Sequence, residues 1–354
     1  MKRELLEQRL REHLSEKPSL KARDILKFIH QSAFGCEHVL TDEASALEGI
    51  LRESEDLGAV ESQTVERLAG EYARVPLCVL KEGLKPETLA RLLVLSATEE
   101  QDARSAAEEL LAVAARLVRE GVCPCSEGAF LRQADAWRAA GYPALHHSEV
   151  YRAAYRPHYR VLSLRFVPLL PLLCAIDHRA RDARFVLAVE GGSASGKTTL
   201  AATLCEVYGA SVFHMDDFFL RPEQRTKERF SQIGGNVDYE RVEEEVLRPL
   251  SCGEDVVFRP FDCRTMTLSG AVHVRPAPLV IVEGAYSMHP RLSGYYDLSV
   301  FLDVTKAVQK ARIERRNTPV LAERFFSEWI PLEDVYFTDT RAKERCEIVL
   351  CVPE

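Results

Sequence analysis

The sequence has 354 residues, and at roughly 100 to 200 residues per domain this length predicts two domains. Hydrophobic residues make up 46% of the chain and charged residues 28%, which excludes a disordered or fibrous protein. The formal net charge of −8 argues against nucleic acid or a membrane surface as the main partner, because such binding usually needs a basic footprint.

The first residues mix acids with apolar residues and lack the uninterrupted apolar core of a signal peptide, so we expect a cytoplasmic protein. The most apolar later stretch, residues 161–176, is interrupted by an arginine and two prolines and is too short for a bilayer span of roughly 20 residues. No membrane helix is predicted. The only close pair among the ten cysteines, Cys123 and Cys125, cannot supply a tetrahedral metal site alone, so free thiols are expected.

Residues 1 to about 150 are dominated by Glu, Arg, Ala and Leu, with apolar residues at steps of three and four, as at Leu89, Leu92 and Leu93. This periodicity predicts an all-helical domain, for which the sequence suggests no function. Two of its segments contain residues that could carry chemistry. Residues 34–38 fit a thiol or metal site, and residues 151–160 fit a nucleotide- or RNA-stacking surface. For both we favour the structural alternative, a helix end and aromatic packing respectively.

From about residue 184, short β-rich runs alternate with helical patterns, which is typical of a parallel sheet wound with helices. We place the boundary in the polar segment 177–184. This gives a helical domain over residues 1–180 and an α/β domain of the P-loop NTPase class, with a doubly wound parallel sheet, over residues 181–354. The expected strands are residues 185–189, 211–215, 256–261, 279–282, 298–302 and 348–352, and the expected helices are residues 197–208, 239–250 and 306–316.

A phosphate-binding loop is predicted at residues 191–198, which satisfy G-x-x-x-x-G-K-[ST] between a strand and a helix. Glycines let backbone N–H groups point at phosphate oxygens, and the following helix adds the positive end of its dipole. Lys197 is expected to reach the β- and γ-phosphates of ATP, and Thr198 to place its hydroxyl on Mg²⁺. The expected nucleotide-binding residues are Gly191, Gly192, Ser193, Ala194, Ser195, Gly196, Lys197, Thr198 and Thr199.

Acidic residues follow two further predicted strands. Carboxylates at the carboxyl end of a parallel strand lie at the rim where ligands bind, so Asp216 is the first candidate for a base that accepts the proton of an attacking hydroxyl. The alternative is that Asp216 and Asp217 are turn or N-cap residues. Glu283 ends another strand and could hold a metal-bound water. Asp303 competes for this role, and the periodicity does not choose between them, although we favour Glu283.

A helical run with Arg312, Arg315 and Arg316 follows Asp303. Phosphoryl transfer spreads negative charge over the γ-phosphate oxygens, and a mobile segment that carries arginines can neutralise this charge as a site closes. The run therefore predicts a lid. The alternative is an ordinary solvated basic helix face.

The motifs occur in a recognisable order: the phosphate-binding loop, Asp216-Asp217-Phe218-Phe219, Gly235-Asn236-x-Asp238, Phe258-x-Pro260-Phe261-Asp262, Glu283-Gly284 and the arginine-rich lid. This order resembles the uridine kinase and phosphoribulokinase-like family of P-loop kinases, over roughly residues 184–352. The resemblance implies an ATP- and Mg²⁺-dependent kinase that phosphorylates a hydroxyl of a small metabolite, with a nucleoside as the first candidate acceptor.

The resemblance also implies roles for single residues: Asp216 as the base, Lys197, Arg312 and Arg316 at the phosphates, Asp217, Asp238 and Phe261 at the acceptor, and Thr198 and Glu283 at Mg²⁺. Uridine kinases generally carry a histidine shortly after this middle strand, whereas residues 262–266 contain none, so a different acceptor stays open. A second hypothesis is a nucleotide-dependent switch in which the P-loop half gates the helical half. A third is that the helical half is an RNA- or protein-binding module. The sequence does not indicate an oligomeric state.

Overall fold

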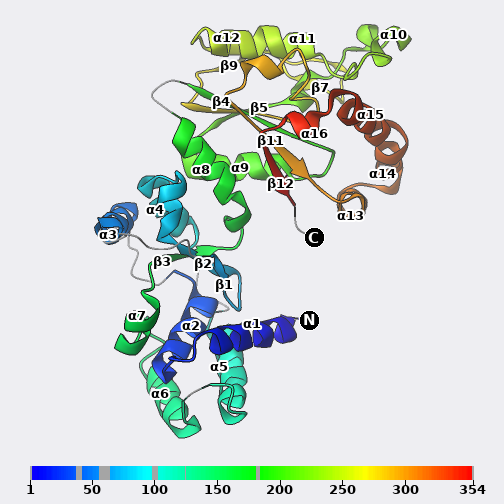
Figure 1. The fold of residues 1–354 in the computed structure, drawn as a ribbon. Helices are drawn as coiled ribbons and strands as arrows, with labels where there is room; N and C mark the ends of the chain where they lie inside the picture. The colour runs from blue at the N-terminus through cyan, green and yellow to red at the C-terminus, as the bar shows by residue number, and fades with distance from the viewer. Residues whose placement is uncertain are drawn as a thin grey trace. The chain divides into compact units, whose positions relative to one another are not determined.

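The computed structural model of the protein describes residues 2–36, 42–55, 64–97, 103–123, 125–180 and 184–352. The chain divides into two compact units, Met1–His178 (unit 1) and Arg179–Glu354 (unit 2). Unit 1 is blue to green in Figure 1, and unit 2 is green to red. Each unit buries its own set of hydrophobic side chains.

Unit 1 is mostly helical, but not all-helical as the apolar periodicity predicted. Its most buried helix is α2 (Ala22–Phe34), in which Ile25, Phe28 and Ile29 are fully buried and which packs against α5 and α6. The other helices are α1 (Lys2–Glu16), α3 (Glu43–Glu55), η1 (Leu77–Glu82), α4 (Pro86–Leu95), α5 (Ala103–Arg119), α6 (Glu127–Ala139), α7 (Glu149–Tyr155), η2 (Val167–Leu169) and α8 (Leu170–Arg179).

Unit 1 also contains a three-stranded antiparallel sheet, in the order β1-β2-β3. β1 (Glu66–Arg67) pairs with β2 (Tyr72–Pro76), and β2 pairs with β3 (Tyr159–Ser163). The sequence did not predict these strands. β2 is short and buried along its whole length, so it lacks the alternation of polar and apolar residues that marks a half-buried strand. The sheet brings residues that are far apart in the sequence side by side next to α2.

Unit 2 contains a parallel five-stranded sheet in the order β12-β11-β4-β10-β5, which confirms the predicted α/β class. The central strand, β4, is buried along its whole length, as expected for a strand covered on both faces. The strands are β4 (Phe185–Gly191), β5 (Ser211–His214), β10 (Leu279–Glu283), β11 (Leu298–Asp303) and β12 (Ile348–Cys351).

The helices of unit 2 include two with the predicted bounds, α9 (Lys197–Tyr208) and α13 (Lys306–Arg316). The predicted helix 239–250 is also present, as a continuous run of α11 (Tyr239–Arg241), the π-helical η5 (Val242–Leu247) and α12 (Arg248–Ser251). The remaining helices are η3 (Met215–Phe218), η4 (Pro222–Gln224), α10 (Lys227–Phe230), η6 (Ser293–Tyr295), α14 (Pro319–Arg324), η7 (Phe325–Trp329), α15 (Ile330–Thr340) and α16 (Ala342–Arg345).

The run 256–261 was wrongly predicted as one strand of the parallel sheet. It forms β6 (Val256–Phe258), which pairs antiparallel with β9 (Val272–Val274), and the start of β7 (Phe261–Asp262), which pairs with β8 (Thr267–Leu268). Pro260 interrupts the run because proline has no N–H to donate to a ladder. Val257 is 44% exposed between buried neighbours, which is typical of an antiparallel strand with one solvated face.

The carboxyl ends of β4, β5 and β10 lie next to one another. Glu283 at the end of β10 stands opposite His214 on β5 and Val189 on β4. Because parallel strands end at the same edge of a sheet, the loops that follow these three strands meet there. Ligands of open α/β sheets bind at this edge.

Among the described helices, none combines the length and the apolar character that a bilayer crossing would need. The apolar stretch 161–176 is divided between β3, η2 and α8, and α8 has only ten residues.

Candidate active site

The loop 191–196 joins β4 to α9 and has the geometry of a phosphate-binding loop. Gly191 has a φ of 150°, and a Cβ there would lie 2.8 Å from the backbone oxygen of Leu302, so only glycine fits. Gly196 adopts a left-handed conformation, with a φ of 105°, as the N-cap of α9. The backbone thus curls in front of the positive end of a 12-residue helix, an arrangement that binds phosphate groups.

Lys197, the first residue of α9, lies over this loop. Its Nζ donates to the carbonyl oxygens of Gly191 and Gly192, each at 2.9 Å. The ammonium is therefore held beside the curled backbone. Thr198 and Thr199 follow on the exposed start of the same helix.

Glu283 connects two of the strand ends at the loop. Its Oε1 accepts a hydrogen bond from the Thr198 hydroxyl at 2.9 Å and lies 2.7 Å from Nδ1 of His214. Burial raises the pKa of the Glu283 carboxyl, but the bonds from His214 and Thr198 outweigh burial and the net pKa is lowered. The bond to Glu283 raises the pKa of His214 in turn. Glu283 is therefore an ionised carboxylate beside the loop.

Asp216 and Asp217 lie in η3, directly after β5. The Asp216 residue is exposed, yet protein surrounds its carboxyl closely enough that partial desolvation raises its pKa. Lys197 opposes this rise, and Glu283 adds to it. Desolvation also raises the pKa of Asp217. The predicted base thus lies within electrostatic range of the loop lysine, with a carboxyl that is easier to protonate than an ordinary aspartate.

Phe261 and Asp238 both lie close to η3. β7, which contains the buried Phe261, packs against η3, and the guanidinium of Arg225 lies 5.7 Å from the centre of the Phe261 ring. Asp238 is 2% exposed: it caps α11 by accepting from the N–H of Arg241 at 3.2 Å and accepts from the Gln224 amide at 2.7 Å. Its carboxylate holds two chain segments together here.

Side chains from the predicted lid contact the loop. Gln309 of α13 donates to the carbonyl oxygen of Ser193 at 2.8 Å, and one nitrogen of Arg312 donates to the carbonyl oxygens of Ala194 and Ser195, each at 3.3 Å. Arg312 therefore reaches the loop from α13. Arg316, one turn further along the same helix, is exposed.

Glu333 of α15 also contacts the loop. It accepts from the Ser193 hydroxyl at 2.6 Å and from the Ser193 N–H at 2.9 Å. Burial raises the pKa of its carboxyl. Sequence reasoning did not single out Glu333 or Gln309, and no local signal could have done so, because both reach the loop only through helix packing.

Glu190, the residue before the loop, is fully buried at the end of β4. Its carboxyl accepts hydrogen bonds from the N–H groups of Gly191 and Met288, at 2.8 and 2.9 Å, and from the Tyr336 hydroxyl at 2.9 Å. It joins the loop to the segment after β10 and to α15. Sequence reasoning missed this residue, although an acid inside a buried strand next to the motif was a usable signal.

Asp303, the alternative to Glu283 for the metal site, ends β11 and bonds to a different partner. Its carboxylate accepts from Lys343 at 2.7 Å, and both side chains are more than a third exposed. Thr198 bonds to Glu283, so Glu283 is the acid that adjoins the loop.

Within the described parts of the chain, no three His, Cys, Asp or Glu side chains are grouped so as to hold a metal ion by themselves. Mg²⁺ needs less from a protein, because it is usually bound through one or two carboxylates, substrate phosphates and water. Thr198 and Glu283 offer the hard oxygen ligands that Mg²⁺ prefers, next to a loop shaped for phosphates. The donor set therefore fits Mg-ATP.

The structure shows a helix end in residues 34–38 and aromatic packing in residues 151–160. In residues 34–38, α2 ends at Phe34 and Gly35 follows it with a φ of 70°, as at a helix end, while residues 37 and 38 lie outside the described residues. In residues 151–160, Tyr151 is buried and stacks on His147 with ring centres 3.9 Å apart. Tyr151 is thus packed inside the unit.

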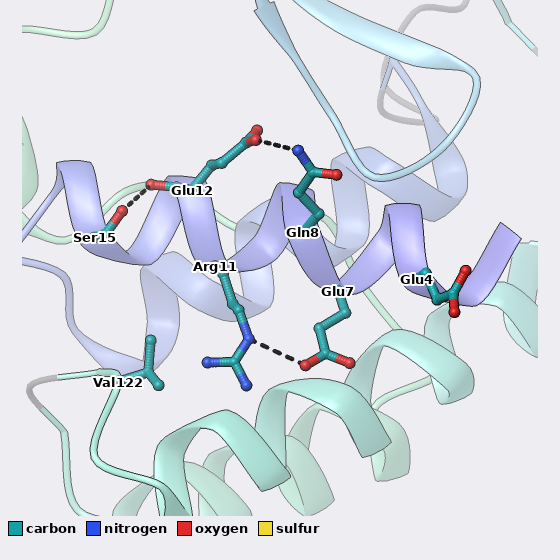
Figure 2. A pocket seen from close by; sticks show the side chains of 7 residues that line it. All are labelled: Glu4, Glu7, Gln8, Arg11, Glu12, Ser15 and Val122. Carbon is teal, nitrogen blue, oxygen red and sulfur yellow. Dashed lines mark hydrogen bonds and ion pairs between the residues drawn. The ribbon is translucent and has the colours of Figure 1, made fainter. Parts of the chain in front are cut away.

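A hollow along α1 is lined mainly by side chains that bond to one another (Figure 2). Gln8 donates to Glu12 at 2.8 Å, and Arg11 donates to Glu7 at 3.0 Å. These groups satisfy one another, so the hollow offers little to a ligand.

Comparison with known proteins shows what part of unit 2 is similar to. Residues 186–318 match the Phosphoribulokinase / Uridine kinase family, which confirms the resemblance seen in the order of the motifs. A uridine kinase from Oceanobacillus iheyensis is 27% identical over 147 residues, which cover 39% of this chain and 69% of that protein. A solved structure named as a possible uridine kinase from Bacillus stearothermophilus is 24% identical, with a TM-score of 0.38, and the match covers 48% of this chain and 90% of that one.

Proposed function

We propose that unit 2, which carries a domain of the phosphoribulokinase/uridine kinase family, transfers the γ-phosphate of ATP to a hydroxyl of a small metabolite. The observation that supports this most is the position of Asp216. It lies in η3, directly after β5 at the carboxyl edge of the sheet, and the charges of Lys197 and Glu283 both act on the pKa of its carboxyl. A nucleotide-dependent switch has no need of a base at this position, whereas a kinase has.

In this proposal the loop binds the phosphates through its backbone N–H groups, and Lys197 turns its ammonium toward the β- and γ-phosphates. Thr198 and Glu283 would hold Mg²⁺, Glu283 directly or through a water. The metal would neutralise charge on the transferring phosphoryl group. Arg312, already at the loop, would add a second positive charge, and Arg316 would approach when the α13–α14 segment closes.

Asp216 accepts the proton of the acceptor's hydroxyl as that oxygen bonds to the γ-phosphorus and the bond to the bridging oxygen of ADP breaks. Its raised pKa brings the carboxyl closer to the working pH, which favours proton transfer. Asp217, Asp238 and Phe261 would hold the acceptor. For Asp238 this requires that it release or share the bond from Gln224.

A nucleoside is the first acceptor to test, with uridine first, because the Oceanobacillus iheyensis relative is a uridine kinase. The absence of histidine from residues 262–266 makes other hydroxyl compounds necessary members of the panel.

The experiment measures ADP release by the full chain with uridine, cytidine, other nucleosides, pantothenate, glycerate and sugar phosphates. One acceptor should raise turnover above the slow ATP hydrolysis seen without it, and Lys197→Ala should abolish that rise. If no acceptor does so, and Asp216→Asn leaves the slow hydrolysis unchanged, the kinase proposal fails. The nucleotide-dependent switch would then be the better account.

A further inference from the structure

We propose that unit 1 contains a binding site for a small phosphate-bearing organic molecule, in the pocket between α2, α7 and β3. The pocket has a volume of about 560 Å³. This lies within the range of about 300 to 1,000 Å³ that is typical of small-ligand sites. The lining residues that the structure describes all belong to unit 1, so the proposed site is separate from the kinase site proposed for unit 2.

The wall of the pocket is basic. Lys27, Arg152 and Arg160 line it, together with three histidines, whereas Glu53 is the only acid among the described lining residues. Glu53 is neutralised by Arg160 through two hydrogen bonds of 2.8 and 3.0 Å. No carboxylate of the described residues forms an ion pair with Arg152, which projects from α7. Among the described lining residues, basic side chains therefore outnumber acidic ones.

Lys27 brings a charged group into a buried position. Only 7% of the residue is exposed, and its Nζ donates to the carbonyl oxygen of Leu145 at 2.6 Å. A buried ammonium is costly unless oxygen ligands surround it. The Leu145 oxygen is one such ligand. A phosphate bound in the pocket would form charge-assisted hydrogen bonds with the basic groups of its wall.

A chain of hydrogen bonds leads from α2 into the same pocket. Nδ1 of His147 lies 3.2 Å from Oδ1 of Asp24, and Nε2 of His147 lies 2.6 Å from the Tyr159 hydroxyl. Asp24 also accepts from Ser148 and from the N–H of Lys21, and hydrogen bonds hold its pKa at about 2 although burial opposes them. An ionised Asp24 places the His147 proton on Nδ1, so Nε2 accepts from Tyr159.

His147 and Tyr159 both line the pocket, so this chain fixes two polar side chains at its wall. Burial lowers the pKa of His147 to about 4, and the positive charges of Arg74 and Lys27 contribute to the shift. His147 is therefore neutral at pH 7. The same neighbouring charges that disfavour a proton on His147 favour an anion in the pocket.

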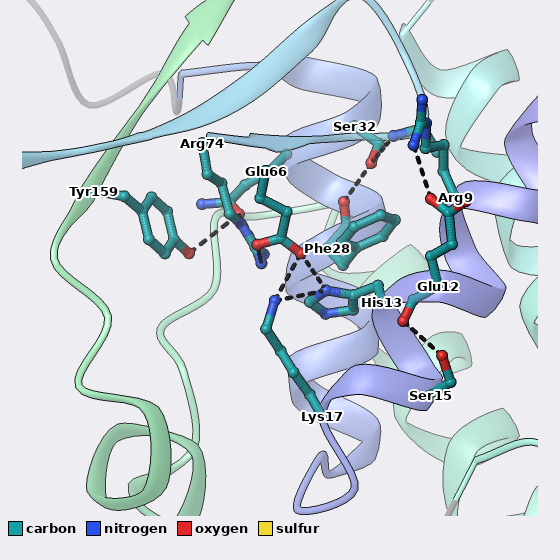
Figure 3. A network of polar contacts seen from close by, with 12 residues as sticks. Arg9, Glu12, His13, Ser15, Lys17, Phe28, Ser32, Glu66, Arg74 and Tyr159 are labelled. Carbon is teal, nitrogen blue, oxygen red and sulfur yellow. Dashed lines mark hydrogen bonds and ion pairs between the residues drawn. The ribbon is translucent and has the colours of Figure 1, made fainter. Parts of the chain in front are cut away.

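Arg74 packs on the ring of Tyr159, next to the pocket wall. Its guanidinium is fully buried, lies 4.8 Å from the centre of the Tyr159 ring and donates to Gln31 at 2.7 and 2.9 Å (Figure 3). Glu66 pairs with it at 3.0 Å. Gln31 lines the pocket and connects this network to the site.

The rest of the lining is less polar. Leu93, Pro157 and Val161 line the same cavity. A free phosphate would leave these side chains without contacts, whereas the organic part of a phosphate ester would cover them. The combination of apolar and basic lining favours an ester over the inorganic ion.

The test uses the full chain with Lys197→Ala, which weakens phosphate binding at the loop of unit 2. Calorimetric titration with inorganic phosphate, glycerol 3-phosphate and AMP measures affinity, and adenosine serves as the uncharged probe. At least one ester should bind saturably and more tightly than inorganic phosphate. Arg152→Ala should then weaken that binding about tenfold or more, because a charge-assisted hydrogen bond is lost.

Two matched variants locate the site. Arg132→Ala removes an exposed arginine of α6 that does not line the pocket and should leave the affinity unchanged. Arg152→Lys keeps the charge and should retain part of the affinity. The proposal is overturned if neither ester binds saturably at millimolar concentrations, if Arg152→Ala binds the esters as tightly as its parent, or if Arg152→Ala weakens the binding of adenosine as much as that of AMP. Arg152 is exposed, so its replacement should not unfold the unit.

Discussion

Thr198 and His214 contact the same oxygen of one carboxylate, Oε1 of Glu283, from the start of α9 and the end of β5. This arrangement links three elements that meet at the carboxyl edge of the sheet. The Thr198 hydroxyl is the expected Mg²⁺ ligand, so the carboxylate that it contacts is placed to hold the same ion or a water bound to it.

We therefore expect Glu283→Gln to weaken Mg²⁺-dependent turnover by about 10- to 100-fold, the usual effect of losing a group that holds or orients a metal ligand. The substitution removes a negative charge but keeps the size of the side chain. Turnover measured against Mg²⁺ concentration should show a higher half-saturation point. Asp303→Asn is the matched control, because Asp303 bonds to Lys343 at the surface, and it should leave the Mg²⁺ dependence unchanged.

Asp216→Asn should lower kcat by about 100- to 10,000-fold if Asp216 is the general base. ATP affinity should change little, because Asn keeps the shape of the side chain. In the unaltered protein, the carboxyl must be ionised to accept a proton, so activity should fall as the pH drops through its pKa. Since burial raises that pKa, the fall should begin at a higher pH than for an ordinary aspartate. A kcat that Asp216→Asn leaves intact would contradict the assignment.

Gly191→Ala should weaken ATP binding, because its Cβ would lie 2.8 Å from a backbone oxygen that cannot move aside cheaply. Backbone strain of this kind costs roughly 1–3 kcal/mol, or about 5- to 150-fold in affinity. Equilibrium binding of a fluorescent ATP analogue measures the effect. Gly294→Ala adds the same methyl group in open space in the same unit and should bind like the parent.

The parts of unit 2 that the sequence predicted correctly are those whose structure depends on a contiguous stretch of residues. The loop 191–198 is contiguous, so its strand, turn and helix could be placed directly, and the structure has α9 at the predicted bounds. Glu333 bonds to Ser193 from 140 residues away along the chain. That contact depends on how α15 packs, and no spacing rule contains this information.

The errors have physical causes. The prediction that residues 256–261 form a strand of the main sheet is wrong because a run of β-branched and aromatic residues has the same sequence pattern in a parallel strand as in an antiparallel one. The antiparallel sheet of unit 1 was missed because β3 finds its partner, β2, far away in the sequence. The polar residues that line the pocket of unit 1 come from α2, α3, α7, β3 and the segments before α7 and β3, which lie far apart in the sequence.

Glu66→Gln should destabilise unit 1 by about 3 kcal/mol, because it leaves the buried Arg74 without its carboxylate. Glu66 also pairs with Lys17 at 2.7 Å and with His13 (Figure 3). Denaturant unfolding followed by the fluorescence of Trp137 reports this unit, in a Trp329→Phe background that removes the other tryptophan. Glu120→Gln removes an acid paired with Arg11 where both side chains are 41% exposed, and it should cost less than about 1 kcal/mol.

His147 should titrate near pH 4 in the folded protein, in contrast to about 6.5 in the unfolded chain. Burial makes the charged form costly, so the folded state binds a proton less readily than the unfolded state. Stability of unit 1 is therefore fully present above about pH 6.5 and is lost as the pH falls from about 6.5 to about 4, by at most about 3 kcal/mol. Proton NMR of the imidazole C–H signals measures the pKa, with the His147 signal assigned by its loss in His147→Gln.

The His147→Gln variant also serves as the control for the predicted pH dependence of stability. Glutamine does not ionise, so the His147→Gln protein should lose less stability than the parent between pH 6.5 and pH 4, whatever its stability at neutral pH. A His147 signal that titrates near 6.5 would show that the imidazole is not held neutral by burial and by the neighbouring charges of Arg74 and Lys27. Such a result would count against a positive electrostatic environment in the pocket, because the charges of Arg74 and Lys27 add to the effect of burial in lowering the pKa of His147.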